Sequence, residues 1–249
     1  MKINDDVLEV LSRCKADGAQ VFLPEQLDRK LYVAVNKVLE AIGGKWNRKA
    51  KAHLFELDAV TRLDDAIVSG EVDKPADFGF FETPEELAIK VVEAAGVKQG
   101  QRVLEPSAGR GRIAVVAHAL GAEVYCVELQ KSNCDALVRI GLGVFSKHIL
   151  HRNFLDMKLD QSFDRICMNP PFAKGQDVMH VMHAYGCLKP GGRLVSIMSA
   201  GVSFRRENKY ETFRRFIYEN GGTLEPLPDD SFKESGTRVR TVLVTMEKR

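Results

Sequence analysis

The sequence predicts an α/β protein whose main part is a doubly wound, largely parallel β-sheet. From Phe80 onward, short apolar strands alternate with helical segments, and this alternation is typical of a parallel sheet with helices on both faces. The chain has 249 residues, which is enough for one such domain and a smaller appendage. We therefore expect an N-terminal accessory region at residues 1–77 and the α/β domain at residues 78–249.

The accessory region is predicted to be small and mainly helical, because its apolar residues recur at helical spacing. The expected elements are helices at residues 5–16, 24–42 and 59–69, and a strand within residues 53–57. Gly43 and Gly44 mark the end of the second helix. The boundary between the two regions is placed in the mixed, polar stretch 70–78, which contains Pro75.

The α/β domain is predicted to begin with a helix that starts at Thr83 and Pro84, as N-cap and first helical residue, and runs to Gly96. The predicted strands are 102–105, 123–127, 149–151, 165–168 and 193–198, and the helices between them are 111–120, 131–140 and 178–187. Two further β-rich segments, 222–227 and 238–246, are separated by a turn-rich stretch. They predict an antiparallel edge to the sheet.

Composition excludes several classes of protein. No apolar stretch approaches the ~20 residues that a membrane helix needs, and the N-terminus is polar, so we expect a cytoplasmic protein. The cysteines are five in number and form no Cys-x-x-Cys pair, which favours reduced core residues. His180 and His183 are spaced as metal ligands on one helix, but a third ligand is not evident, and no metal is expected. Net charge is +2, which leaves the partner and the oligomeric state open.

A glycine-rich turn predicts a cofactor site. The strand that ends at Glu105 turns through Gly109 and Gly111 into a helix, and glycines there let the backbone approach a ligand closely. The next strand ends in Glu128, where an acid can accept both hydroxyl groups of a ribose. Residues 109–114 also fit a loose dinucleotide pattern, so a nicotinamide cofactor is an alternative.

The tetrapeptide Asn169-Pro170-Pro171-Phe172 follows a later strand and indicates methyl transfer to a planar nitrogen. Two prolines hold the backbone extended with no N–H to donate, so the segment presents acceptors only. The Asn169 side-chain oxygen and the Pro170 carbonyl are placed to accept the two N–H bonds of an exocyclic amino group, and Phe172 offers a stacking face. A surface turn after a strand is the alternative interpretation.

In order and spacing these motifs resemble class I S-adenosylmethionine-dependent methyltransferases with a Rossmann-like fold, and most closely the gamma-order N6-adenine DNA methyltransferases of small phage or plasmid type. The resemblance covers Phe80 to the C-terminus. It implies S-adenosylmethionine as cofactor and DNA as substrate. The implied cofactor-binding residues are Phe81, Thr83, Glu105, Ser107, Gly109, Glu128, Leu129, Asn153 and Phe154. Asn153 stands where the family has an acid, and its amide oxygen can still face the adenine of the cofactor.

The substrate side is predicted from the remaining motifs. Residues 231–237 resemble the Ser-Gly-Thr hairpin of DNA adenine methyltransferases, and Phe204 is a candidate second wall for a flipped base. Basic residues between Arg205 and Arg215 indicate a phosphate-facing surface. Lys45, Trp46, Arg48 and Lys49 belong to a stretch with an aromatic ring and no acid, which favours nucleic-acid contact. An RNA base methyltransferase and a catalytically silent nucleic-acid-binding protein are the alternatives.

Overall fold

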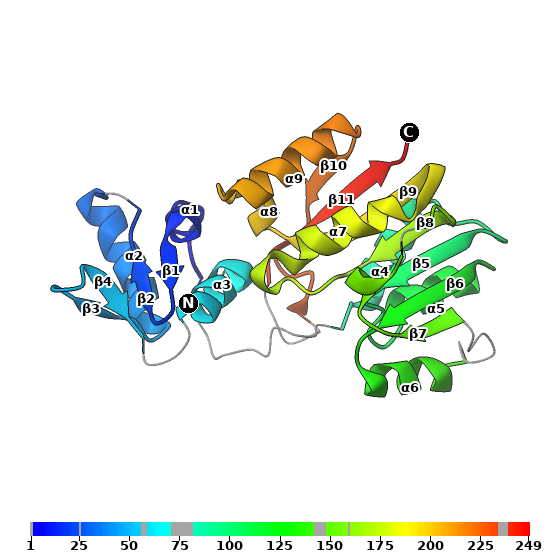
Figure 1. Ribbon diagram of the computed structural model, residues 1–249, viewed down its shortest axis with the longest axis horizontal. Helices are drawn as coiled ribbons and strands as arrows, with labels where there is room; N and C mark the ends of the chain where they lie inside the picture. Colours follow the sequence, from blue (N-terminus) through cyan, green and yellow to red (C-terminus); the bar gives the residue numbers. More distant parts are fainter. Residues whose placement is uncertain are drawn as a thin grey trace.

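The structure is a computed structural model that describes residues 2–24, 26–55, 59–70, 82–141, 148–158, 160–233 and 239–249. Figure 1 shows two parts side by side: a small N-terminal region and a larger α/β domain. The proposed boundary at residues 70–78 lies almost entirely outside the described residues, as does Phe81.

The N-terminal region contains three helices and a small sheet. Its elements are α1 (Asp5–Arg13), β1 (Lys15–Asp17), β2 (Gln20–Phe22), α2 (Arg29–Ala41), β3 (Lys45–Asn47), β4 (Ala52–Leu54) and α3 (Ala59–Ser69). The strands pair antiparallel in the order β1-β2-β4-β3. The helices agree with the prediction of a mainly helical region, whereas of the four strands only the one at β4 was predicted.

Two predicted helix boundaries in this region are also wrong. α1 ends at Arg13 and the chain continues as β1. α2 begins at Arg29, later than predicted, because the Asp28 side chain caps it by accepting the backbone N–H groups of Lys30 at 2.9 Å and Leu31 at 3.1 Å.

The larger domain is a seven-stranded sheet with helices on both faces, as predicted. Its first half consists of α4 (Glu85–Ala95), β5 (Arg102–Pro106), α5 (Arg112–Ala119), β6 (Glu123–Glu128), α6 (Lys131–Arg139), β7 (Ile149–His151) and the 3-10 turn η2 (Phe154–Asp156). The second half consists of β8 (Phe163–Met168), the 3-10 turn η3 (Ala173–Gly175), α7 (Gln176–Gly186), β9 (Leu188–Ser199), α8 (Gly201–Phe204), α9 (Asn208–Glu219), β10 (Thr223–Pro226) and β11 (Thr241–Glu247).

The order of the strands determines where this sheet can bind a ligand. The order is β10-β11-β9-β8-β5-β6-β7, and β11 and β10 form the predicted antiparallel edge. From β5 the chain builds outward to β6 and β7, and it then returns to place β8 on the other side of β5. The carboxyl ends of β5 and β8 therefore flank the point where the strand order reverses, which is where open α/β sheets bind ligands.

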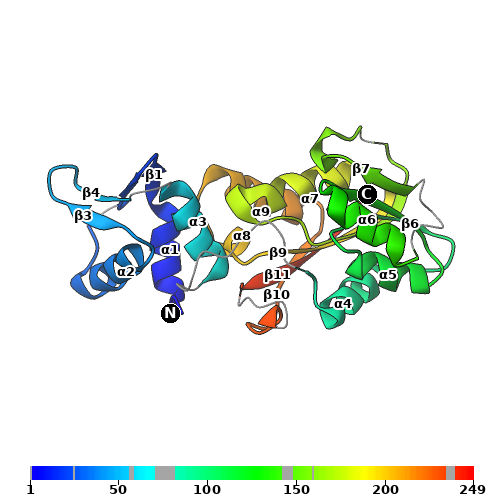
Figure 2. The same ribbon diagram turned by 90° about the horizontal axis from the view of Figure 1, so that it is seen from below.

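The core lies on both faces of this sheet. Consecutive strand residues alternate between two apolar clusters: Val103 faces α4, α5 and α6, whereas Leu104 faces α7 and α9. A third cluster fills the N-terminal region, and Phe204 from the α/β domain packs against it. Figure 2 shows α3 and α8 where the two parts meet.

Candidate cofactor and methyl-transfer site

The turn after β5 is built from residues in the left-handed conformation. Ser107, Gly109 and Gly111 have φ angles of 64°, 53° and 82°. The Ala108 N–H donates to the Val127 carbonyl at 3.0 Å, which ties the turn to the neighbouring strand β6. Gly111 then occupies the N-cap of α5. The backbone thus reverses sharply at the carboxyl edge of the sheet and leaves room for a ligand to approach.

Glu128, at the end of β6, braces this turn. Its Oε2 accepts the Gly109 N–H at 2.8 Å and its Oε1 accepts the Gln130 N–H at 2.7 Å. Asn133 Nδ2 donates a third, longer bond to Oε1 at 3.4 Å. A carboxylate offers about four acceptor sites, so Glu128 keeps capacity for a ligand hydroxyl group. The sequence did not indicate this bracing role, which comes from the side-by-side pairing of β5 and β6.

Glu105 is a buried acid beside the same turn. Its side chain is 3% exposed, and Oε2 has no hydrogen-bond partner among the residues that the structure describes. Burial raises the pKa of this carboxyl well above its usual value; the backbone N–H of Ala114 opposes the shift, and the charge of Glu128 adds to it. A buried acid of this kind is stabilised as an anion when a cationic group lies next to it.

His180, on α7, also contacts the turn. Its Nδ1 lies 3.1 Å from the Ser107 hydroxyl, and burial, with a smaller contribution from His183, lowers the pKa of the imidazole to about 4. The ring is therefore neutral at pH 7 and helps to hold Ser107 in its left-handed conformation. The sequence indicates His180 only as a possible metal ligand and does not reveal this contact. The described residues contain no group of three or more potential metal ligands.

Asn169 follows β8 and has one free acceptor. Its Nδ2 donates to the Thr83 hydroxyl at 3.0 Å, and its Oδ1 is buried without a partner among the described residues. Leu104 pairs with Ile166 across β5 and β8, so Asn169 lies just beyond the level of Glu105 on the adjacent strand. The prediction of Thr83 as helix N-cap is wrong. Pro84 occupies that position, and the Thr83 hydroxyl binds Asn169 instead.

The rest of the tetrapeptide is enclosed. Pro170 is buried, and Phe172 is 4% exposed and packs in the apolar cluster with Leu227 and Val239. The open stacking face expected for Phe172 is therefore absent from this conformation. Sequence could identify an aromatic ring next to the site, but the covering residues come from segments distant in the chain.

The residues predicted to surround the cofactor adenine have mixed placements. Leu129 is 65% exposed directly after Glu128, as an adenine-flanking residue requires. Phe154 is buried in the core and meets the His183 ring edge-on at 4.9 Å. Asn153 uses its Oδ1 to accept the Leu155 N–H at 3.2 Å and so caps η2. The amide oxygen expected to face adenine is thus already engaged locally.

The predicted substrate-contacting residues do not gather at this site. Phe204 packs against the N-terminal cluster, so its position does not support a role as a wall for a target base. Lys45 and Trp46 lie on β3, and Arg48 and Lys49 lie in the turn to β4. Trp46 is 44% exposed and its ring lies 5.1 Å from that of His53. These residues form a basic hairpin in the N-terminal region, away from the glycine turn (Figure 1).

The basic surface predicted near α9 is partly wrong. Arg205 is buried and pairs with Asp64 and Glu207, while Arg214 donates to the carbonyls of Val202 and Arg205. The guanidinium groups of both residues therefore make contacts within the protein. The Ser-Gly-Thr residues 235–237 lie outside the described residues.

The strand order and the site define a protein that binds an organic ligand at the switch point of an open α/β sheet. The methyltransferase small domain family matches residues 85–216, more than half of the chain, and the chain belongs to this family. S-adenosylmethionine is accordingly the cofactor of this domain. No helix among the described residues is long and apolar enough to span a membrane.

Curated relatives are methyltransferases with different substrates. A protein-L-isoaspartate O-methyltransferase from Anaeromyxobacter dehalogenans is 30% identical over 152 residues, which are 56% of this chain and 70% of that enzyme. A tRNA (guanine(10)-N2)-dimethyltransferase from Methanothermobacter thermautotrophicus is 29% identical over 91 residues. These cover 35% of this chain and 26% of that enzyme, so the chain matches only about a quarter of its length.

Solved structures share the fold at low identity. The M protein of the type I restriction enzyme EcoKI has a TM-score of 0.58 at 14% identity, and the match covers 99% of this chain and 58% of the M protein chain. The type I methyltransferase subunit from Streptococcus thermophilus has a TM-score of 0.57 at 22% identity, over 88% of this chain and 54% of its own. TrmN from Thermus thermophilus has a TM-score of 0.50 at 20% identity, over 66% of this chain and 49% of its own.

The residues at the switch point fit S-adenosylmethionine. The unpartnered Glu105 Oε2 suits a cofactor that carries positive charge on its methionine part, and the exposed Leu129 suits a flat base. The Glu128 carboxylate, at the end of the next strand, is the acid that would hold the ribose. A nicotinamide cofactor, the alternative left open by the glycine pattern, is not needed to account for these residues.

Proposed function

We propose that the protein transfers the methyl group of S-adenosylmethionine to the N6 amino group of adenine in DNA. The observation that carries this proposal is the Asn169 side chain, whose Nδ2 is held by Thr83 while its buried Oδ1 has no partner among the described residues. An acceptor fixed in this way suits a ligand with a polarised N–H group, because an unpaired buried acceptor is costly.

The chemistry assigned to the chain's own residues is mainly positioning. When bound, the cofactor supplies an electrophilic methyl group on a sulfonium. Asn169 Oδ1 and the Pro170 carbonyl accept the two N–H bonds of the amino group, which directs the nitrogen lone pair towards the methyl carbon. Bound S-adenosylmethionine would donate the methyl group and leave as S-adenosylhomocysteine, and the amino proton would pass to water. No side chain has to act as a dedicated base.

The choice of DNA rests on how far the structural likeness extends. The restriction methyltransferase subunits cover 88% and 99% of this chain, so the likeness includes much or all of the N-terminal region, whereas TrmN covers 66%. The basic hairpin in that region supplies charge suited to a phosphate backbone.

RNA is the second candidate substrate, because a curated relative acts on a guanine amino group of tRNA. The isoaspartate methyltransferase points to a carboxylate oxygen instead. A carboxylate has no N–H to donate to Asn169 Oδ1, so the acceptor-only site argues against it.

The test is methyl transfer from labelled S-adenosylmethionine to duplex DNA, single-stranded DNA, tRNA and an isoaspartyl peptide in parallel. We expect incorporation into DNA that is lost in Asn169→Ala and kept in Asn208→Ala, because Asn208 is an exposed residue at the start of α9. Incorporation into tRNA or the peptide alone would contradict the proposed substrate.

A further inference from the structure

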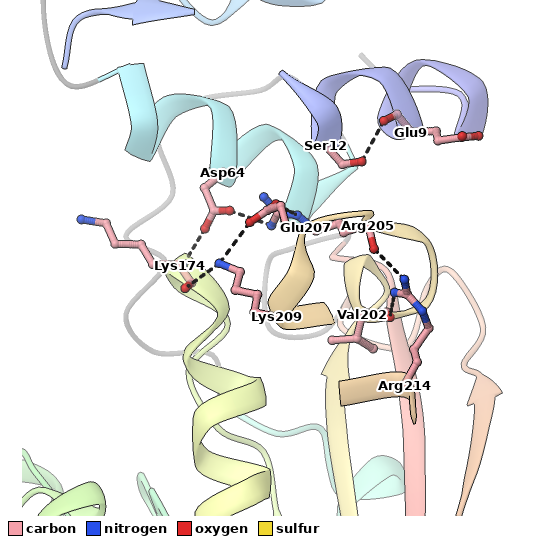
Figure 3. Close-up of polar contacts among 9 residues, drawn as sticks. All are labelled: Glu9, Ser12, Asp64, Lys174, Val202, Arg205, Glu207, Lys209 and Arg214. Carbon is pink, nitrogen blue, oxygen red and sulfur yellow. Dashed lines mark hydrogen bonds and ion pairs between the residues drawn. The ribbon is translucent and has the colours of Figure 1, made fainter. Parts of the chain in front are cut away.

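Asp64, on α3 of the N-terminal region, contacts Lys174 and Arg205 of the α/β domain (Figure 3). Its Oδ2 accepts the backbone N–H of Lys174 at 2.5 Å, and its Oδ1 accepts from Arg205 Nη1 at 2.7 Å. Asp64 and Arg205 are both buried. One carboxylate therefore joins the N-terminal region to the turn η3 and to the segment that follows α8.

Both backbone polar groups of Lys174, in the turn η3, are hydrogen-bonded to side chains. Asp64 binds the Lys174 N–H, and Lys209 Nζ donates to the Lys174 carbonyl at 3.2 Å. Lys174 has a φ of 57°, a left-handed conformation that a residue with a side chain adopts only when its surroundings require it. Lys174 lies only two residues after Phe172, so these contacts fix the end of the segment that begins at Asn169.

Arg205, which donates to Asp64, is itself fixed by several contacts and can therefore orient the Asp64 carboxylate. Its Nε donates to Glu207 at 3.0 Å, and its guanidinium lies 4.8 Å from the centre of the Tyr210 ring. Arg214 donates to the Arg205 carbonyl at 2.8 Å. Lys209 has a further ion pair with Glu207 at 3.4 Å, which links the two sides of the network.

We propose that Asp64 is a positioning residue that makes the N-terminal region part of the active centre. By holding the Lys174 N–H, it keeps residues 169–172 in the geometry that presents Asn169 Oδ1 to the substrate. The N-terminal region thus acts on the reaction through a contact with Lys174, in the turn η3 that directly follows the segment 169–172, in addition to any contact with nucleic acid. The kinetic part of this inference rests on the proposed methyl transfer, whereas the structural part does not.

The test compares two conservative variants of the full chain. Asp64→Asn keeps the size of the side chain but removes the charge, so its single amide oxygen cannot serve both Lys174 and Arg205 as the carboxylate does. Glu9→Gln is the matched control, because Glu9 pairs with Arg206 across the same junction and makes no contact with η3 in the described structure. Thermal unfolding of both variants checks that each is folded.

The first readout is amide hydrogen exchange of residues 173–175, which requires no catalytic activity. We expect exchange at the Lys174 amide to speed up about tenfold or more in Asp64→Asn, because a charge-assisted hydrogen bond is weakened. The rate in Glu9→Gln should match that of the wild type. Equal protection of Lys174 in the wild type and in Asp64→Asn would overturn the proposal.

The second readout combines kcat with cofactor affinity, which distinguishes an effect on the position of residues 169–172 from an effect on cofactor binding. We expect Asp64→Asn to lower kcat about tenfold with less than a twofold change in the dissociation constant for S-adenosylmethionine, because the cofactor turn does not contact Asp64. Faster exchange with unchanged kcat would overturn the positioning role. Failure of the wild type to methylate any nucleic acid would contradict the proposed function, and the exchange result would still decide whether Asp64 holds the loop.

Discussion

The Thr83 hydroxyl accepts a hydrogen bond from Asn169 Nδ2 at 3.0 Å and thereby determines which end of the amide is free. The two residues lie 86 positions apart in the chain. Thr83 comes just before α4 and Asn169 just after β8, and the fold brings them together at the carboxyl edge of the sheet.

This contact predicts the effect of Thr83→Val, which replaces the hydroxyl by a methyl group of similar size. Without its acceptor the Asn169 amide can rotate, and we expect kcat to fall about fivefold, which corresponds to one net hydrogen bond of about 1 kcal/mol. Thr83→Ser, which keeps the hydroxyl, should retain most of the activity. Steady-state kinetics at saturating cofactor would measure this, and equal rates for the valine and serine variants would refute the orienting role.

Much of the α/β domain could be predicted because its strands and helices are long enough to show their periodicity. Most of the N-terminal sheet could not, since its strands have three residues each and, unlike the equally short β7, do not alternate with helices in a regular α/β pattern. Thr83 shows another limit. Threonine before a proline and two acids is a typical helix start, and only the fold reveals that Asn169 competes for the hydroxyl. His180 and Phe172 likewise depend on neighbours distant in sequence.

Glu128→Ala should weaken binding of S-adenosylmethionine by about 1.5–3 kcal/mol, because the variant loses a charged acceptor. The structure adds a second contribution, since the bond from the Gly109 N–H to Glu128 is lost as well. Isothermal titration calorimetry measures the affinity. Glu123→Gln, at the opposite end of the same strand, is the control and should bind normally. Unchanged affinity in Glu128→Ala would exclude this residue from the cofactor site.

The raised pKa of Glu105 predicts that binding of the cofactor releases protons. Burial raises the pKa of this carboxyl well above its usual value, so the free protein keeps the Glu105 proton to a higher pH than an exposed glutamate does. A cationic ligand next to it favours the anion and lowers the pKa, and affinity should therefore increase as the pH rises through the raised pKa. Calorimetry at a series of pH values, each in two buffers with different ionisation enthalpies, would detect the released protons. Glu105→Gln should abolish the difference between buffers, and its absence in the wild type would contradict this account.

The basic hairpin is tested by the salt dependence of DNA binding. Neutralising Lys45, Arg48, Lys49 and Lys51 together should weaken affinity and reduce the slope of log K against log salt by about one per lost phosphate contact. Neutralising Lys98 and Lys131, which lie in the α/β domain, provides a control and should leave the slope unchanged. An unaltered slope in the hairpin variant would place DNA contact elsewhere.

The chemical identity of the product tests the central claim, that Asn169 presents an acceptor to the amino group of adenine in DNA. The measurement is mass spectrometry of nucleosides from DNA digested after incubation with the protein and S-adenosylmethionine. We predict N6-methyladenine with the wild type and its loss in Asn169→Ala, while cofactor binding by that variant stays nearly intact. Methylated cytosine, or methyl groups found only on RNA or protein, would contradict the account.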